Sequence, residues 1–213
     1  MQETETHPMT VTASELNKLK RGPASVLPAI AERWSPRAFS DREVSPADLA
    51  KVFEAARWAP SSSNGQPWKY IVGLRNSETH KKIVSALVGF NQAWAPKAPV
   101  LILGIANTKF AKDGAANDYA FYDLGTATGF LVLQATSMGL ATHQMAGFDH
   151  DAIRKAFEIP GDYALGSVMA LGYQEDPATL ANPKLIEMET STRNRKPLNE
   201  FVLTALGQPL HLG

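Results

Sequence analysis

The sequence of 213 residues contains no cysteine. Disulfide bonds, thiolate metal ligands and a cysteine nucleophile are therefore excluded, and the composition fits a reducing compartment. The sequence also lacks an excess of either charge, because 21 basic residues balance 21 acidic ones. No global field would hold the protein on nucleic acid or on an anionic membrane, so we expect neither as a partner. Any anion site must be local.

Long apolar runs are missing too. No stretch approaches the roughly 20 apolar residues that a membrane helix needs, and the polar residues 1–10 lack the basic and then apolar layout of a signal peptide. We therefore expect a cytoplasmic protein. Its 44% hydrophobic content is sufficient for one ordinary core. The composition predicts a polar arm over residues 1–23, with a short helix capped by Thr12 and Glu15, followed by one domain over residues 24–213.

Several catalytic signatures are absent from the sequence. It has no G-x-G-x-x-G fingerprint, no Walker sequence, no H-E-x-x-H motif and no G-x-S-x-G elbow. Their absence argues against a Rossmann dehydrogenase and against a serine hydrolase built on residues 61–63. His143 and His150 lie seven residues apart, and the neighbouring Asp149 and Asp151 suit a helix cap better than metal ligation. We predict no metal site.

Apolar periodicity predicts alternating helices and strands. Residues 45–48 supply an N-cap, a proline at the first helical position and an early acidic residue, and Gly139 stands where a left-handed helix end belongs. The nearly continuous apolar run 98–106 suits a strand buried on both faces. We expect helices over 26–32, 46–59, 78–88, 121–138 and 151–157, strands over 69–74, 98–106 and 165–173, and a basic, then extended segment over 193–202. This order predicts an α+β fold, or loosely α/β, with a central mixed sheet.

Three polar side chains, Arg33, Ser35 and Arg37, stand at alternate positions just after the first of these helices. In extended backbone they would point the same way. Two guanidiniums and a hydroxyl suit a phosphate or a polarised carbonyl. The plainer explanation for an isolated motif is that Arg33 complements the negative end of its helix while Arg37 is solvated. Alone, the motif does not decide between the two.

Two further segments carry the same ambiguity. The loop over residues 60–68 is dense in short hydrogen-bonding side chains and stiffened by two prolines. This suits the edge of a heterocycle, although the same residue types form ordinary turns. Arg193 and Arg195 could face one anion, such as a phosphomonoester, although a basic tail is also common as a solvated end.

In combination the motifs are more informative. With residues 91–94 before the apolar strand and residues 146–149 after the long helix, they resemble the nitroreductase family in order and spacing, over roughly residues 24–203. The resemblance implies a three-layer α-β-α fold with a central, mostly antiparallel mixed sheet and a C-terminal extension that crosses to the partner subunit. It also implies an FMN-dependent oxidoreductase that passes hydride from NAD(P)H to nitroaromatic, quinone or similar small acceptors by a ping-pong mechanism.

The resemblance gives each motif a role. It implies phosphate contacts for Arg33, Arg193 and Arg195. Arg37 would lie near the flavin N1 and O2 atoms, where a cation stabilises the reduced flavin. Asn91 would bond the pyrimidine edge of the flavin. No catalytic side chain is expected, because the hydride chemistry belongs to the cofactor.

Two remaining segments complete the predicted site. The backbone around Ala146 and Gly147 would donate to flavin N5, a contact that survives although many nitroreductases carry glutamate in place of Ala146. The loop over residues 60–64 would come from the neighbouring subunit, which predicts a homodimer with two shared FMN sites. The predicted cofactor-binding residues are Arg33, Ser35, Arg37, Pro60, Ser61, Ser62, Ser63, Asn64, Asn91, Ala146, Gly147, Arg193 and Arg195.

Three alternatives remain open at this stage. The first is a specialised relative, such as a reductive dehalogenase or a flavin-cleaving enzyme. Deiodinase relatives clamp their substrate with a glutamate, a tyrosine and a lysine from a lid, and residues 107–122 contain Tyr119 and Lys112 but no glutamate. The second is an FMN-binding protein without turnover. The third, an adaptor that has lost FMN, is disfavoured because all three phosphate-side arginines are present.

Overall fold

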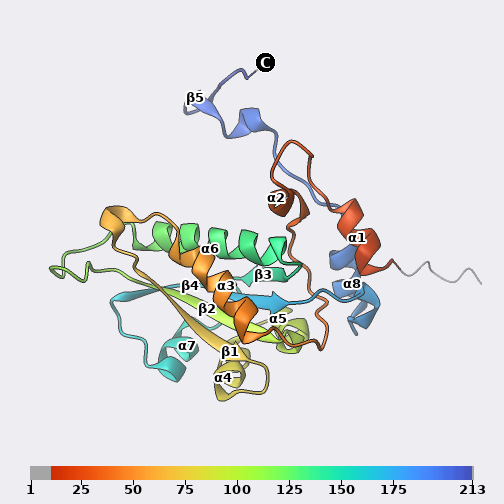
Figure 1. The fold of residues 1–213 in the computed structure, drawn as a ribbon, viewed down its shortest axis with the longest axis horizontal. Helices are drawn as coiled ribbons and strands as arrows, with labels where there is room; N and C mark the ends of the chain where they lie inside the picture. Colours follow the sequence, from red (N-terminus) through yellow and green to blue (C-terminus); the bar gives the residue numbers. More distant parts are fainter. Residues whose placement is uncertain (1–10, 213) are drawn as a thin grey trace, which may run out of the picture.

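A four-stranded sheet with the strand order β1-β2-β4-β3 forms the centre of the molecule (Figure 1). Every neighbouring pair of strands is antiparallel. The strands are β1 (Trp68–Leu74), β2 (Val100–Asn107), β3 (Ala141–Met145) and β4 (Tyr163–Gly172). The computed structural model describes residues 11–212. Gly213 and residues 1–10, which hold the start of the predicted arm and the stretch without a signal-peptide pattern, lie outside the described residues.

Helices cover both faces of this sheet. Successive residues of β2 point to opposite sides, so Ile102 packs with α3 (Pro46–Arg57) and α6 (Ala120–Ser137), whereas Leu103 packs with α4 (Glu78–Ala86) and α7 (His150–Phe157). Residues 100–106 of β2 are buried throughout. The predicted three-layer α+β fold with a mostly antiparallel sheet is confirmed, and so is the apolar strand at its centre.

Local signals in the sequence begin and end several helices as predicted. The Ser45 hydroxyl accepts the N–H of Asp48 at the start of α3, and Asp149 accepts two backbone N–H groups at the start of α7. Thr12 and Glu15 form a capping box at α1 (Ala13–Leu19). Gly139, with φ of 74°, follows α6 in the left-handed region that favours glycine.

Several elements have no counterpart among the predicted ones. They are β3, α5 (Asn91–Trp94), α8 (Pro183–Thr190) and the two short strands after residue 202. α2 (Pro28–Glu32) is shorter than expected, and short 3-10 turns occur at η1 (Ser62–Asn64), η2 (Ala95–Lys97), η3 (Pro177–Thr179) and η4 (Leu198–Glu200). α1 packs against the rest of the protein, because its Leu16 is 1% exposed. α1 and α8 thus both contribute to the folded body, because Leu185 of α8 is 1% exposed as well.

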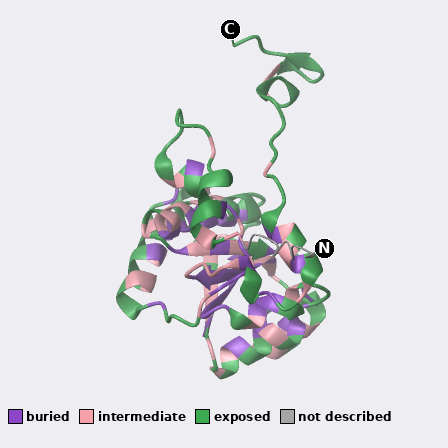
Figure 2. Ribbon diagram, turned by 90° about the vertical axis from the view of Figure 1, so that its right-hand side faces the viewer, coloured by how far each residue is buried: buried purple, intermediate pink, exposed green. Residues whose placement is uncertain are grey.

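The C-terminal segment leaves this body after α8 and ends in a small hairpin of β5 (Leu203–Ala205) and β6 (Gln208–Pro209). Figure 2 shows the segment as almost entirely exposed. η4 interrupts the extended conformation expected over residues 193–202. Within residues 11–212, no helix is long and apolar enough to cross a membrane.

Candidate functional site

Two adjoining cavities lie between α6 and the β3 edge of the sheet. One, of 320 Å³, is lined by Arg33, Ser35 and Thr142 together with Gly129, Val132 and Leu133 of α6. The other, of 280 Å³, reaches Ala146 at the end of β3. The Gln144 side chain borders both. Together they form what we call the α6–β3 groove, which runs about 13 Å along β3 from Thr142 to Ala146.

Cations gather at the Arg33 end of the α6–β3 groove. The Arg33 Nη1 donates to the Ser35 Oγ at 3.3 Å. Burial lowers the pKa of Arg33, and the charges of Arg193 and Arg195 lower it further. Arg193 is held by backbone, since its Nη1 donates to the carbonyl oxygen of Lys20 at 2.8 Å. Cations that repel one another in one place form a site that favours an anion.

Asn91 and Gly147 meet near the opposite end of the α6–β3 groove. The Asn91 Nδ2 donates to the Gly147 carbonyl oxygen at 3.0 Å, and the backbone N–H of Val88 donates to the same oxygen at 3.2 Å. A Cβ atom on Gly147 would lie 2.7 Å from Asn91 Nδ2, so a larger residue there would displace the Asn91 amide. The structure therefore brings together two predicted residues that are 56 positions apart.

The loop over residues 60–64 lies elsewhere. The Ser62 N–H donates to the Asp123 carboxylate at 3.1 Å, in the first turn of α6, whereas Arg33 lines a cavity with Leu133 near the last turn. Ten residues of helix separate these points by about 15 Å. Ser63 and Asn64 have φ of 50° and 52°, a strained conformation that is common at functional sites. Within one chain the loop is thus separated from the Arg33 end of the α6–β3 groove by most of the length of α6.

Comparisons with known proteins agree with this arrangement. A sequence model of the nitroreductase family matches residues 30–92 and 84–173. The chain belongs to the nitroreductase family. A protein of Archaeoglobus fulgidus that carries the name of an NADH dehydrogenase/NAD(P)H nitroreductase is 34% identical over 154 residues, 70% of this chain and 86% of its own length. A protein of Bacillus subtilis named FMN reductase [NAD(P)H] is 31% identical over 132 residues, 55% of this chain and 52% of its own.

A solved structure extends the likeness to nearly the whole nitroreductase chain. It is described as an oxidoreductase containing FMN, is 31% identical, and superposes with a TM-score of 0.80 over 87% of this chain and 95% of its own. The family and these relatives identify the protein as an oxidoreductase. The family model ends at residue 173, so α8, Arg193 and Arg195 lie outside it, as does α1.

Arg37 occupies a different environment from Arg33 in this nitroreductase. Its guanidinium Nη1 lies 3.6 Å from the Glu189 carboxylate of α8, which is fully buried. Burial raises the pKa of Glu189, and the backbone N–H groups of Arg37 and Ala38 oppose that rise. The charges of Arg37 and Lys20 act on the carboxylate in the same direction as these donors. Glu189 therefore serves as a counterion within a group of cations that we call the cation cluster. Its members are Lys20, Arg33, Arg37, Arg193 and Arg195.

His143 contacts the chain segment that carries Arg37. Its Nδ1 is 3.0 Å from the Pro36 carbonyl oxygen, and its ring centroid is 4.5 Å from that of Trp94. Because a carbonyl oxygen only accepts, Nδ1 must carry the proton. Burial, and secondly the Arg37 charge, lower the pKa of His143 to about 4. The imidazole is therefore neutral at neutral pH.

This pKa predicts a loss of stability in mild acid. Between pH 6.5 and 4 the unfolded chain binds a proton that the folded chain does not, so the free energy of unfolding should fall by about 2 kcal/mol between pH 7 and 5. Urea denaturation at both pH values, on the wild type and on His143→Gln, measures the difference. The raised pKa of Glu189 changes the free energy of unfolding with pH in the opposite direction. Both proteins contain Glu189, so its effect cancels in the difference between wild type and His143→Gln. Equal pH dependence of both proteins would contradict the prediction.

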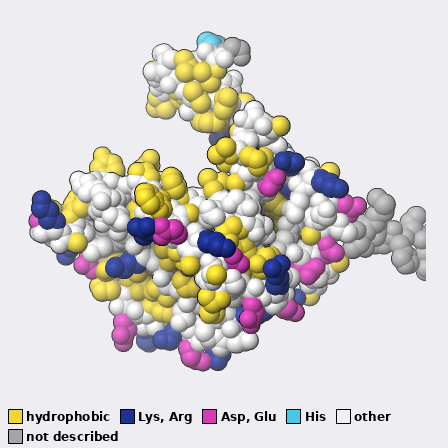
Figure 3. Space-filling view, viewed as in Figure 1, with side chains coloured by type: hydrophobic (Ala, Val, Ile, Leu, Met, Phe, Trp, Pro, Cys, Tyr) yellow, Lys and Arg dark blue, Asp and Glu magenta, His cyan; other side chains and the backbone are white. Residues whose placement is uncertain are grey.

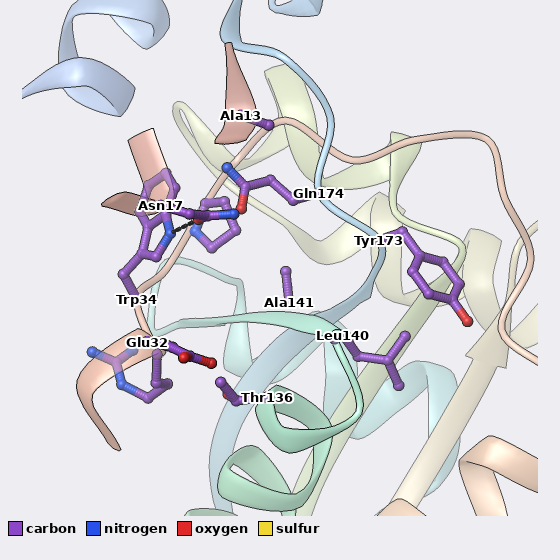
Figure 4. A pocket seen from close by; sticks show the side chains of 12 residues that line it. Ala13, Asn17, Glu32, Trp34, Thr136, Leu140, Ala141, Tyr173 and Gln174 are labelled. Carbon is purple, nitrogen blue, oxygen red and sulfur yellow. Dashed lines mark hydrogen bonds between the residues drawn. The ribbon is translucent and has the colours of Figure 1, made fainter. Parts of the chain in front are cut away.

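A third cavity, of 330 Å³, adjoins the Arg33 end of the α6–β3 groove behind Trp34 (Figure 4). The Trp34 Nε1 donates to the Asn17 side chain of α1 at 2.8 Å. The Lys20 Nζ lies 4.5 Å from the centroid of the Trp34 ring. α1 and its C-cap Lys20 thus contact the segment that carries Arg33.

Residues absent from the sequence-based prediction include Lys20, His143, Gln144 and Glu189. Glu189 and the backbone of Lys20 meet the site through contacts that span most of the chain, so no local sequence pattern indicates them. In the sequence, His143 stands out only as a candidate metal ligand. It lies between Pro36 and Trp94, whereas His150 stacks on Phe148 with ring centroids 4.5 Å apart. Among residues 11–212, no group of three or more His, Cys, Asp or Glu side chains is arranged to hold a metal.

Proposed function

We propose that this nitroreductase binds FMN in the α6–β3 groove and transfers hydride from NAD(P)H to nitroaromatic, quinone or similar small acceptors by a ping-pong mechanism. The observation that carries the proposal is the placement of Arg33, Arg193 and Arg195 at one end of the groove, with the Asn91–Gly147 contact near the other. The three arginines suit a phosphate, and the Asn91 side chain with the neighbouring backbone suits the edge of a polar heterocycle. The names of the FMN-containing relatives support the choice of cofactor.

The residues present fit the cofactor chemically. Arg33, Ser35, Arg193 and Arg195 would hold its phosphate, and Asn91 with the backbone at residues 146–147 would meet its ring system. Gly125 and Gly129 leave open space on the α6 wall, because a Cβ atom added to either would meet nothing within 4 Å. When bound, FMN supplies the hydride acceptor and donor atom. The chain's own residues bind and orient it.

A homodimer completes the proposed site. The loop over residues 60–64 lies at the first turn of α6, whereas the Arg33 end of the α6–β3 groove lies near its last turn, so two antiparallel copies of this helix would bring each loop to the Arg33 end of the other subunit's groove. The solvent-facing side of α6 is mostly apolar or small, with Tyr122 74% and Phe130 42% exposed. The C-terminal hairpin also gathers exposed hydrophobic side chains (Figure 3), including Leu206. We propose that this extension crosses to the partner.

The function is tested by the visible spectrum of the purified protein. We expect FMN added before gel filtration to stay with the protein at one flavin per chain, and to bleach when NADPH or NADH is added without oxygen. Retained colour without bleaching would favour an FMN-binding protein without turnover. A protein that retains no flavin would contradict the proposal, whatever its activity toward nitro compounds.

The dimer is tested by a charge on the exposed side of α6. Phe130→Glu should shift the protein from dimer to monomer in light scattering after gel filtration, because the two-fold axis would bury two unpaired carboxylates. FMN retention should be lost with the dimer. Leu19→Glu, which charges a side chain that is 76% exposed on α1, is the control. A monomeric wild type, or a dimeric Phe130→Glu that keeps FMN, would contradict the arrangement.

A further inference from the structure

One peptide unit of the proposed FMN site is held at both of its polar ends. Its carbonyl oxygen belongs to Pro36 and lies 3.0 Å from the His143 Nδ1. Its N–H belongs to Arg37 and donates to the Glu189 carboxylate, at 2.8 Å to Oε1 and 3.0 Å to Oε2. The two partners come from β3 and α8, which lie on different segments of the chain. With both ends fixed, the plane of this peptide cannot rotate.

The orientation of this peptide determines the directions of the side chains beside it. Ser35 lies one residue before the peptide and lines the α6–β3 groove, and Arg37 follows it directly. The Ala38 N–H also donates to Glu189 Oε1, at 3.2 Å. The carboxylate is 0% exposed. A buried carboxylate is costly unless it is hydrogen-bonded and paired, and these N–H groups and the Arg37 guanidinium meet both conditions for Glu189.

Glu189 also balances charge. Its Oε2 lies 3.6 Å from the Arg37 Nη1, and its charge acts on Lys20 as well. Three further cations, Arg33, Arg193 and Arg195, lie close enough to act on one another's pKa, and Arg193 also acts on Lys20. Glu189 therefore offsets part of the positive charge that the cluster presents to an anion.

We propose that Glu189 and His143 are positioning residues of the FMN site: they clamp the Pro36–Arg37 peptide, and the Glu189 charge limits how strongly Arg37 stabilises reduced FMN. The proposal rests on the proposed function. It assigns a role to α8, which lies outside the part of the chain that the family model matches. Neither side chain needs to touch the cofactor.

The proposal predicts separate effects on affinity and on potential. Glu189→Ala and His143→Ala each release one end of the peptide and should weaken FMN binding at least tenfold in a fluorescence titration. Glu189→Gln keeps the size and one acceptor oxygen but loses the charge. The Arg37 charge would then favour reduced over oxidised FMN about tenfold more, which raises the two-electron midpoint potential by about 30 mV.

Two comparisons separate this role from a purely structural one. Glu187→Gln removes the same charge from an exposed position of α8 and should change neither quantity. In Arg37→Gln/Glu189→Gln, both members of the pair are neutral, and the potential should return below that of Glu189→Gln. A structural role alone would not produce this reversal.

Each outcome decides the question. Wild-type protein that does not bind FMN contradicts the proposed function and the inference with it. Wild-type protein that binds FMN, with a Glu189→Gln variant of unchanged affinity and potential, contradicts the inference alone. A Glu189→Gln variant that circular dichroism shows to be unfolded would make Glu189 a residue of the fold and overturn the positioning role.

Discussion

The Arg33→Ala variant is expected to bind FMN more weakly by about 1 to 3 kcal/mol, or roughly 5- to 150-fold, because it removes a charged hydrogen-bond donor to the phosphate. Arg195→Ala should show a loss of the same order. Without FMN, however, Arg33→Ala should melt at the same temperature or higher, because the wild-type guanidinium is partly buried beside Arg193 and Arg195. A loss of affinity without a loss of stability is the expected pattern of a binding residue.

Fluorescence titration with FMN and melting of the FMN-free protein measure both quantities. The matched control is Arg57→Ala, since Arg57 pairs with Glu54 and lies over the ring of Trp58 on the exposed side of α3, where ion pairs contribute little. It should change neither quantity. Unchanged FMN affinity in both Arg33→Ala and Arg195→Ala would remove the phosphate site from the cation cluster.

Leu131→Ala is expected to destabilise the fold by about 2 to 5 kcal/mol, because it removes a fully buried side chain from the contact of α6 with the sheet. For a chain of this length the melting temperature should fall by roughly 4 to 20 °C. Calorimetry at one protein concentration measures the shift. Leu19→Ala, at a helix position that is 76% exposed, is the control and should change the melting temperature little. Equal melting temperatures would show that α6 is not seated on the sheet as described.

The fold could be predicted from sequence where the signal is local. Leu124, Leu131 and Ala135 recur at helical spacing and are buried in α6, and the apolar run of residues 100–106 became the central strand β2. β3 was missed because it has only five residues at the edge of the sheet and includes the exposed Gln144. α8 could have been found, since Asn182 and Pro183 form the same kind of helix start as Ser45 and Pro46.

The site was predictable only as a set of residue types. Arg33 and Ser35 stand together, as their spacing suggested, and Asn91 meets Gly147. Their common location could be predicted only through the family resemblance, since no local rule places residue 193 beside residue 20. The buried pairing of Arg37 with Glu189 joins residues 152 positions apart. No local sequence pattern predicts it.

The bond between Arg193 and the carbonyl of Lys20 joins residues 173 positions apart. Closing so long a loop has a large entropic cost, and the contact cannot form until almost the whole chain has been synthesised. During translation, α3, the sheet and α6 can therefore assemble while the anion site is still open. If FMN binds as proposed, it would enter after the chain leaves the ribosome, and newly made protein would exist first as a folded but colourless precursor.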